Sequence, residues 1–333
     1  MIPFQTRMNS PFSTQLVCVL LITFCSLNSF VLAQDEEKPE KELPPVESHT
    51  LQTKDGIILH VKFYPGTKGK DSIPIILLHG MLNPSASSAV YLNLAADIQK
   101  TMGHAVIIPD LRGHGKTLKK RIAGNPNGRA DIKKREAFTK NDYSNVIWDI
   151  EACKTFLRAR NDEEELNLEK LTVVGSDVTA MLAMNWAALD WNKPGKGLIR
   201  NGQDVKALIL FSPLQSHKGL TPQLGLTHPT VKQQLNIMII APQQNPQYLS
   251  SSQRIHKQLK GFHNEQKKDE KGAILWSSTK LFLFRLNTGV VGADILKTAN
   301  VVKQTHFLIG NFLLNRLEKD ETLEWSSRDP NAL

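Results

Sequence analysis

The sequence predicts one large α/β domain with a mostly parallel central sheet and helices on both faces. Seven short runs rich in β-branched residues alternate with stretches of helical periodicity, as strands joined by crossover helices do. The later runs are apolar throughout, which is typical of central strands covered on both faces, whereas the first alternates apolar and polar residues like an edge strand. The seven runs are Ile57 to Tyr64, Ile73 to Leu78, Ala105 to Ile108, Leu171 to Val174, Val205 to Phe211, Asn236 to Ile240 and Lys280 to Leu286.

The first 33 residues have the features of a secretory signal peptide. Arg7 supplies a positive charge, an apolar stretch runs from Leu16 to Leu32, and Val31-Leu32-Ala33 precedes Gln34 as a small-residue cleavage site does. Polar residues interrupt the stretch and acidic residues follow it, which favours cleavage over a permanent anchor. We therefore expect an exported protein, extracellular or periplasmic, with no stable membrane anchor after cleavage.

Composition divides the rest of the chain into three parts. Residues 34–50 are rich in Glu, Lys and Pro and predict a flexible linker, residues 51–317 form the domain, and residues 318–333 form a polar tail. Cys153 is the single cysteine after residue 33, so the domain must depend on its core rather than on disulfides. The helical spacing of Val146 to Leu157 places Cys153 on the buried side of a helix.

Two strand ends carry loops that resemble those of the α/β-hydrolase superfamily. One apolar run ends in His79-Gly80, and the next ends in Pro109-Asp-Leu-Arg-Gly-His-Gly115, with helix-like sequence between them. The resemblance spans Leu51 to Leu317 and implies the α/β-hydrolase fold, with a short lid region at residues 213–234. It also implies that the first loop, at Gly80 and Met81, lends backbone N–H groups to an oxyanion hole, while the second loop is a structural turn.

The superfamily's nucleophile lies on a tight strand-to-helix turn with the pattern Gly-x-nucleophile-x-Gly. The segment Leu171-Thr-Val-Val-Gly-Ser-Asp-Val-Thr-Ala180 occupies that place. Gly175 matches the first glycine and Thr179 the second, so Asp177 falls on the nucleophile position. Ser176 is one residue out of register, which directs its side chain elsewhere. By the same alignment Ser176 and Val178 join Gly80 and Met81 as pocket residues.

The positions of the acid and the base are also altered. Alignment with the superfamily places Asn245 at the acid position and Val291 at the base position, and no histidine lies between His263 and His306. Haloalkane dehalogenases and epoxide hydrolases of this superfamily attack with an aspartate, but they still need a histidine to activate water. Valine carries no proton, and general-base catalysis contributes roughly 10²–10⁴-fold. The alignment therefore predicts a pseudoenzyme, in which Asp177 could simply cap the following helix.

Other histidines offer weak substitutes for the missing base. His306 falls inside the closing helical pattern, Ile295 to Leu317, while His79 and His114 belong to structural loops. His217 and His228 lie in the lid region and could face the pocket. The sequence has no metal-ligand spacing, phosphate loop or dinucleotide fingerprint, so we expect no metal, no cofactor and no nucleic-acid partner.

Three functions remain open from the sequence. The first is a non-catalytic protein that binds a small-molecule or acidic ligand in the crevice at the carboxyl ends of the strands. The second is an active hydrolase, acting on an ester or related bond, that uses Asp177 or Ser176 with an unplaced histidine. The third is a module that interacts through its outer surface.

The loop at residues 116–140 is strongly basic. It holds nine Lys and Arg residues against Asp131 and Glu136, within a sequence whose formal net charge is +9. Such a loop could concentrate an acidic ligand near the pocket, and a sulfated polysaccharide is one candidate polyanion. The alternative that the sequence favours is a solvated, mobile insertion, since Asn125-Pro-Asn-Gly128 is typical of a turn.

Overall fold

The computed structural model describes residues 43–328, except residues 84, 194, 197 and 198. The expected signal peptide at residues 1–33 and the linker up to residue 42 lie outside the described residues. Within residues 43–328, apart from those four positions, no helix has the length and apolar character that a membrane crossing requires.

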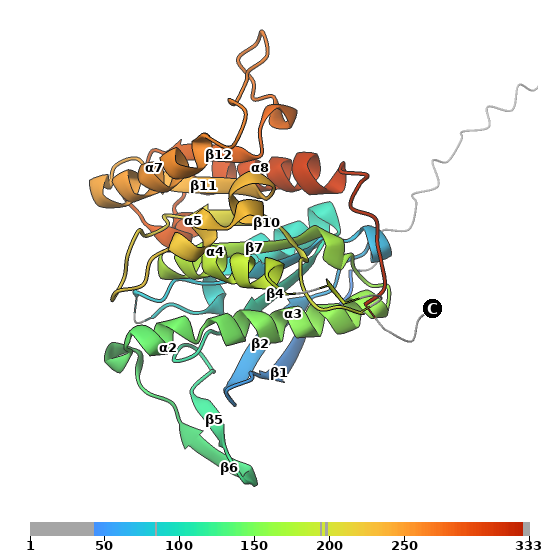
Figure 1. Ribbon diagram of the computed structural model, residues 1–333, viewed down its shortest axis with the longest axis vertical. Helices are drawn as coiled ribbons and strands as arrows, with labels where there is room; N and C mark the ends of the chain where they lie inside the picture. The colour runs from blue at the N-terminus through green and yellow to red at the C-terminus, as the bar shows by residue number, and fades with distance from the viewer. Residues whose placement is uncertain (1–42, 84, 194, 197–198, 329–333) are drawn as a thin grey trace, which may run out of the picture. The chain divides into compact units, whose positions relative to one another are not determined.

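An eight-stranded sheet forms the centre of the domain, with the strand order β1-β2-β4-β3-β7-β10-β11-β12 (Figure 1). β1 and β2, and β2 and β4, pair antiparallel, and every other neighbouring pair is parallel. All seven predicted strands are present, so the predicted fold class is confirmed. The strands are β1 (Glu47–Gln52), β2 (Ile58–Tyr64), β3 (Pro74–Leu77), β4 (Ala105–Pro109), β7 (Leu171–Ser176), β10 (Val205–Phe211), β11 (Asn236–Pro242) and β12 (Leu281–Leu286).

Both edges of the sheet differ from the prediction. β1 begins at Glu47 and pairs along β2, so β2 is not the edge strand and the fold starts before Leu51, inside the expected linker. The sequence Glu-Ser-His-Thr-Leu-Gln lacks an apolar run because one face of this edge strand is solvated. β12, which we expected to be central, is the opposite edge, and Arg285 on it is exposed.

Helices cover both faces of the sheet, as the alternating pattern predicts. One face packs against α3 (Ile147–Asp162), α4 (Val178–Trp191) and α7 (Pro246–Lys260), and the other packs against α1 (Leu92–Asp97) and α8 (Val302–Leu313). The side chain of Cys153 is fully buried in the first core.

The closing helix is shorter than its apolar pattern suggests. A 3₁₀ helix at Gly292–Lys297 precedes α8, and a π-helical turn at Leu314–Glu318 follows it. Thr298 and Asn300 lie in the break between the 3₁₀ helix and α8. Both residue types favour turns over helix interiors, because their side chains compete for backbone hydrogen bonds.

The expected lid region does not cover the crevice. Its two short helices, α5 (Gln223–Thr227) and α6 (Pro229–Gln233), pack on α4 instead. α4 is apolar on nearly every side and needs cover away from the sheet as well as on it. The contact is close at Gly225, where a Cβ atom would lie 2.5 Å from the carbonyl oxygen of Met184.

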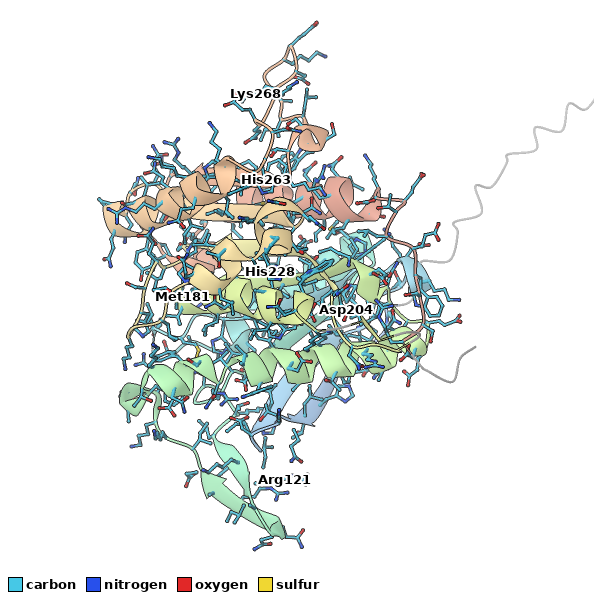
Figure 2. The ribbon with its side chains drawn as sticks, in the orientation of Figure 1. Arg121, Met181, Asp204, His228, His263 and Lys268 are labelled. Atoms are coloured by element: carbon cyan, nitrogen blue, oxygen red, sulfur yellow. The ribbon has the colours of Figure 1, made fainter. Side chains whose placement is uncertain are left out.

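The basic loop forms a defined hairpin rather than an irregular insertion. β5 (Lys119–Ile122) and β6 (Asn125–Asp131) pair antiparallel, and α2 (Lys140–Ser144) follows them. The hairpin extends away from the main sheet (Figure 1), with Arg121 near its outer end (Figure 2). A backbone hydrogen bond of 2.8 Å from Arg121 N–H to the Gly56 carbonyl ties β5 to the turn between β1 and β2. A separate two-stranded sheet, β8 (Gly195–Lys196) with β9 (Ile199–Arg200), follows α4.

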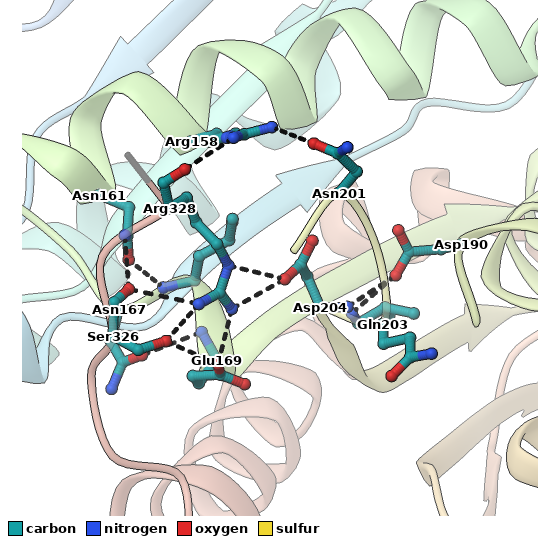
Figure 3. Close-up of polar contacts among 12 residues, drawn as sticks. Arg158, Asn161, Asn167, Glu169, Asp190, Asn201, Gln203, Asp204, Ser326 and Arg328 are labelled. Atoms are coloured by element: carbon teal, nitrogen blue, oxygen red, sulfur yellow. Dashed lines mark hydrogen bonds and ion pairs between the residues drawn. The ribbon is translucent and has the colours of Figure 1, made fainter. Parts of the chain in front are cut away.

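The polar tail is held by buried charges (Figure 3). Arg328 is only 1% exposed, and its guanidinium pairs with Asp204 at 2.9 Å and with Glu169 at 2.7 Å. Asp204 also pairs with Lys154 at 2.6 Å, and Lys154 pairs in turn with Asp190. The described part of the tail, up to Arg328, was expected only to be polar and is a strap fastened by a buried ionic network.

We predict that Arg328→Met lowers the free energy of unfolding by roughly 3–5 kcal/mol, because Asp204 and Glu169 would keep buried charge without their arginine. Urea unfolding at neutral pH measures the loss. Arg254→Met, at an exposed arginine on α7, is the matched control and should change stability by less than about 0.5 kcal/mol. Equal effects of the two substitutions would mean that the network does not fasten the strap.

Candidate functional site

A strained turn joins β7 to α4 at the nucleophile position. Asp177 has φ 48° and ψ −110°, a conformation that costs of order 1–3 kcal/mol for a residue with a side chain. Asp177 N–H donates to the Phe211 carbonyl at 2.9 Å, which ties the turn to β10. Gly175 lies so close to the start of α4 that a Cβ atom would be 2.6 Å from Ala180 Cα. The structure thus places a strand-to-helix elbow at Gly175 to Val178.

The side chain of Asp177 accepts hydrogen bonds from the backbone groups expected to form the oxyanion hole. Its Oδ1 atom accepts from Met81 N–H at 3.3 Å and from Val178 N–H. The residue is 7% exposed. The two donors therefore converge on one oxygen, and that oxygen belongs to the protein itself.

Burial raises the pKa of the Asp177 carboxyl from its ordinary 3.8 to about 7. Hydrogen bonds from the backbone of Val178, Met81 and Thr179 favour the ionised form and act against this rise, while the negative charge of Asp294 adds to it. Near neutral pH the carboxyl group is thus divided between its protonated and ionised forms.

A cavity of about 390 Å³ opens beside the elbow. Its wall includes Asp177 and Val291, at the nucleophile and base positions, together with Gly80 and Ser176. Asn245, at the acid position, does not line it. The remaining lining residues are His79, Leu82, Asn83, Ser85, Ala86, Ser87, Ala89, Val90, Tyr248, Ala293, Asp294 and Lys297.

Asn245 has a structural task at the end of β11. Its side chain accepts a 3.4 Å hydrogen bond from Tyr248 N–H, which caps the N-terminus of α7. Tyr248, one helical turn further on, faces the cavity instead. Of the three aligned positions, Asp177 and Val291 therefore share a cavity wall, whereas Asn245 caps a helix and does not line the cavity.

Ser176 is buried and used as a connector. Its Oγ atom accepts a 2.7 Å hydrogen bond from Ala293 N–H, and the side chain is 1% exposed. Gly292 must be a glycine here, because its φ is 63° and a Cβ atom would lie 2.5 Å from Ser176 Oγ. Ser176 thereby joins β7 to the 3₁₀ helix Gly292–Lys297, as its place out of register suggests.

His79 is the one histidine on the cavity wall, and both of its ring nitrogens are engaged. Leu111 N–H donates to Nε2 at 3.0 Å, so the proton lies on Nδ1, which contacts the Gly80 carbonyl at 2.7 Å. Burial lowers the pKa of His79 to about 4, and neighbouring His114 contributes to the decrease. A neutral histidine fixed in this way links the two loops and has no free nitrogen to act as a base.

The other histidines considered above do not line the cavity. His217 packs its ring against Tyr143 with centroids 4.8 Å apart, and His228 contacts Asn192 at 3.2 Å. His306 pairs with Asp97 at 3.0 Å on the side of the sheet covered by α1 and α8.

Several polar residues of the cavity were not found from the sequence. Asp294 and Lys297 form an ion pair of 2.8 Å on the 3₁₀ helix, and Tyr248 also lines the cavity. The sequence does contain a signal for part of this wall, because four small polar residues, Asn83, Ser85, Ser87 and Ser88, follow closely after the His79-Gly80 loop.

Comparison with known proteins agrees with this architecture. A sequence model described as the alpha/beta hydrolase fold matches residues 73–258. No curated protein matches the sequence. Among solved structures, an esterase of Pyrobaculum calidifontis is similar with a TM-score of 0.56 and 13% identity, covering 82% of this chain and 85% of its own.

Two further esterase structures are similar. An esterase of Pyrococcus furiosus has a TM-score of 0.54 and 15% identity, covering 82% of this chain and 92% of its own. Esterase 2 of Thermogutta terrifontis, phosphorylated by paraoxon, has a TM-score of 0.53 and 15% identity, covering 82% and 95%. At these identities the likeness concerns the fold. Since the matching sequence model spans more than half of the residues and the sheet, elbow and helices agree with it, the chain belongs to the α/β-hydrolase fold family.

Proposed function

We propose that this protein is a non-catalytic member of its family that binds a small molecule in the cavity beside Asp177. The main support for this proposal is that Asp177 Oδ1 accepts hydrogen bonds from both Met81 N–H and Val178 N–H. In an acyl-transfer enzyme such donors stabilise the oxygen that becomes negative in the transition state. Here a substrate oxygen would have to displace a carboxylate oxygen of the protein.

The surroundings of Asp177 also lack a group that could complete a reaction cycle. An ester formed on Asp177 is released only when a base activates water. Val291 occupies the base position on the cavity wall, and His79 has both nitrogens engaged. This arrangement supports binding without turnover.

The cavity suits a small molecule without net negative charge. Its volume of about 390 Å³ lies within the range of roughly 300–1,000 Å³ typical of ligand pockets. Apolar side chains of Leu82 and Val291 share the wall with Asp177 and Asp294, and Lys297 already pairs with Asp294. An acidic ligand would therefore meet more negative than positive charge in this cavity.

Active hydrolysis remains a second candidate, because the elbow keeps its strained backbone and both oxyanion donors. In that case Asp177 would turn its carboxylate out of the two donors and attack the substrate with Oδ2 or Oδ1. The first test below separates the two candidates.

We predict that the protein neither hydrolyses p-nitrophenyl esters above the rate of Asp177→Asn nor gains mass on incubation with paraoxon. The related Thermogutta terrifontis esterase 2 is phosphorylated by paraoxon and serves as the positive control. Product release is followed by absorbance and labelling by intact mass spectrometry. Turnover abolished by Asp177→Asn, or a phosphoryl group on Ser176, would establish the hydrolase instead.

We predict that Val291→Trp fills the cavity and abolishes binding of neutral fluorinated fragments detected by ¹⁹F NMR line broadening. Val290→Trp is the matched control, because Val290 is 38% exposed and does not line the cavity. Fragments that bind the wild type should bind this control equally. If the same fragments also bind Val291→Trp, the cavity is not the ligand site.

We predict that Asp177→Asn is about as stable as the wild type at pH 4 and more stable at pH 8. The carboxyl pKa is about 7 when folded and 3.8 ordinarily, so the folded state binds the proton more tightly than the unfolded state. The resulting contribution to stability is complete below about pH 4 and is lost as the pH rises to about 7, by up to about 4 kcal/mol. Asparagine offers the same acceptor oxygen without this loss. Urea unfolding at both pH values measures the difference, and an equal effect at both would contradict the raised pKa.

A further inference from the structure

We propose that the hairpin β5–β6 and the segment after it bind a linear polysaccharide that carries sulfate or carboxylate groups. We call residues 116–140 the basic hairpin. It contains nine cationic side chains and two acidic ones. The proposed surface lies outside the cavity beside Asp177, so it adds a second binding site to the one proposed above.

Nearly all of these cations are exposed. Arg135 is the exception, since its guanidinium donates to the Met81 carbonyl at 3.2 Å and to the Leu82 carbonyl at 2.7 Å. It fixes the end of the basic hairpin to the loop that borders the cavity. The exposed cations are Lys116, Lys119, Lys120, Arg121, Arg129, Lys133, Lys134 and Lys140.

The strand register places two of the cations opposite one another. Arg121 pairs with Arg129 across the hairpin, whereas Lys119 pairs with Asp131 and forms an ion pair of 2.6 Å with it. Like charges directly opposite on neighbouring strands destabilise a hairpin, and an anion held between them removes the repulsion. Two guanidinium groups also match the paired oxygens of sulfate or carboxylate. Arg129 Nη1 additionally donates to the Gly128 carbonyl at 3.0 Å.

Part of the positive charge is not neutralised within the protein. Lys133 pairs with Asp142 at 3.1 Å, and Lys119 with Asp131 as above. Over the described part of the chain, Lys120, Arg121 and Lys134 form no ion pair. These three side chains can therefore approach an external anion without first breaking an internal one.

The surface chemistry favours a hydrated polyanion over a single-stranded nucleic acid or a membrane surface entered by aromatic side chains. Phe138 is the single aromatic residue of the basic hairpin, and it is 4% exposed. Exposed aromatic rings on which bases stack, or which anchor a protein at a membrane surface, are therefore missing from this surface. The exposed large apolar side chains are limited to Leu118 and Ile122. What remains is a narrow ribbon of ammonium and guanidinium groups.

A second projecting loop supplies a matched control. Residues 264–276 extend from the other end of the domain, where Lys268 is seen in Figure 2. This loop also carries three exposed lysines, Lys267, Lys268 and Lys271, but three acidic residues balance them. Reversing three charges here changes the net charge of the protein as much as reversing three on the basic hairpin.

The test is a titration of the full chain with fluorescein-labelled dextran sulfate, followed by fluorescence anisotropy. The wild type should bind dextran sulfate and not uncharged dextran, with an affinity that falls steeply with salt, because the screening length is ~8 Å at physiological ionic strength. The variant K120E/R121E/K134E should bind at least roughly tenfold more weakly. The variant K267E/K268E/K271E should bind dextran sulfate with an affinity within about twofold of that of the wild type. Both triple variants should have melting temperatures within about 4 °C of the wild type.

Three outcomes would overturn the proposal: equal loss in both triple variants, no loss in the hairpin variant, or tighter binding to duplex DNA or to vesicles of phosphatidylglycerol and phosphatidylcholine than to dextran sulfate. Equal loss would assign binding to net charge alone. Val291→Trp should bind dextran sulfate like the wild type, so the result does not depend on the function proposed for the cavity.

Discussion

The convergence of two backbone N–H groups on Asp177 Oδ1 is the constraint around which the crevice is arranged. It holds together the His79-Gly80 loop, the end of β7 and the start of α4, because one donor comes from Met81 and the other from Val178. It also offsets the strain of the elbow, since a carboxyl group that accepts both bonds stabilises the φ of 48° that brings it there. The same two bonds explain how a carboxyl group remains in a site that is 7% exposed.

Other polar residues around Asp177 also form hydrogen bonds within the protein. Three polar residues near the elbow each have a hydrogen-bonding role of this kind. Asn245 caps α7, Ser176 accepts from the 3₁₀ helix, and His79 joins the two glycine-containing loops. Because these bonds are internal, the polar groups at the crevice are largely satisfied before any ligand arrives. A ligand in the proposed cavity would meet Asp177, Tyr248 and the other residues of the wall.

The central strands were accessible from the sequence because a strand buried on both faces must be apolar along its length, and β2 was accessible because its apolar and polar residues alternate. β1 was not predicted, because its sequence, Glu-Ser-His-Thr-Leu-Gln, has no apolar run. This edge strand is held in the sheet by pairing with β2. The elbow could be located because Gly175 and the turn residues after it lie in one short segment of the sequence. The contribution of Asp294, Lys297 and Tyr248 could not, because their approach to Asp177 depends on how the 3₁₀ helix and α7 pack, which is a tertiary property. The same applies to the lid region, whose helices are drawn onto α4 by apolar surface that periodicity alone does not assign to a partner.

The strap at Arg328 has a consequence for the order in which the domain is completed. Arg328 lies 124 residues after Asp204 and 159 after Glu169 in the chain, yet it neutralises both in the buried network. At synthesis rates of about 5–20 residues per second, Asp204 emerges roughly 6–25 s before the arginine that pairs with it. During that interval Lys154 is the cation available to Asp190 and Asp204. Arg328 is thus the last member of the buried network to be made, so the network is complete only after synthesis has passed this residue.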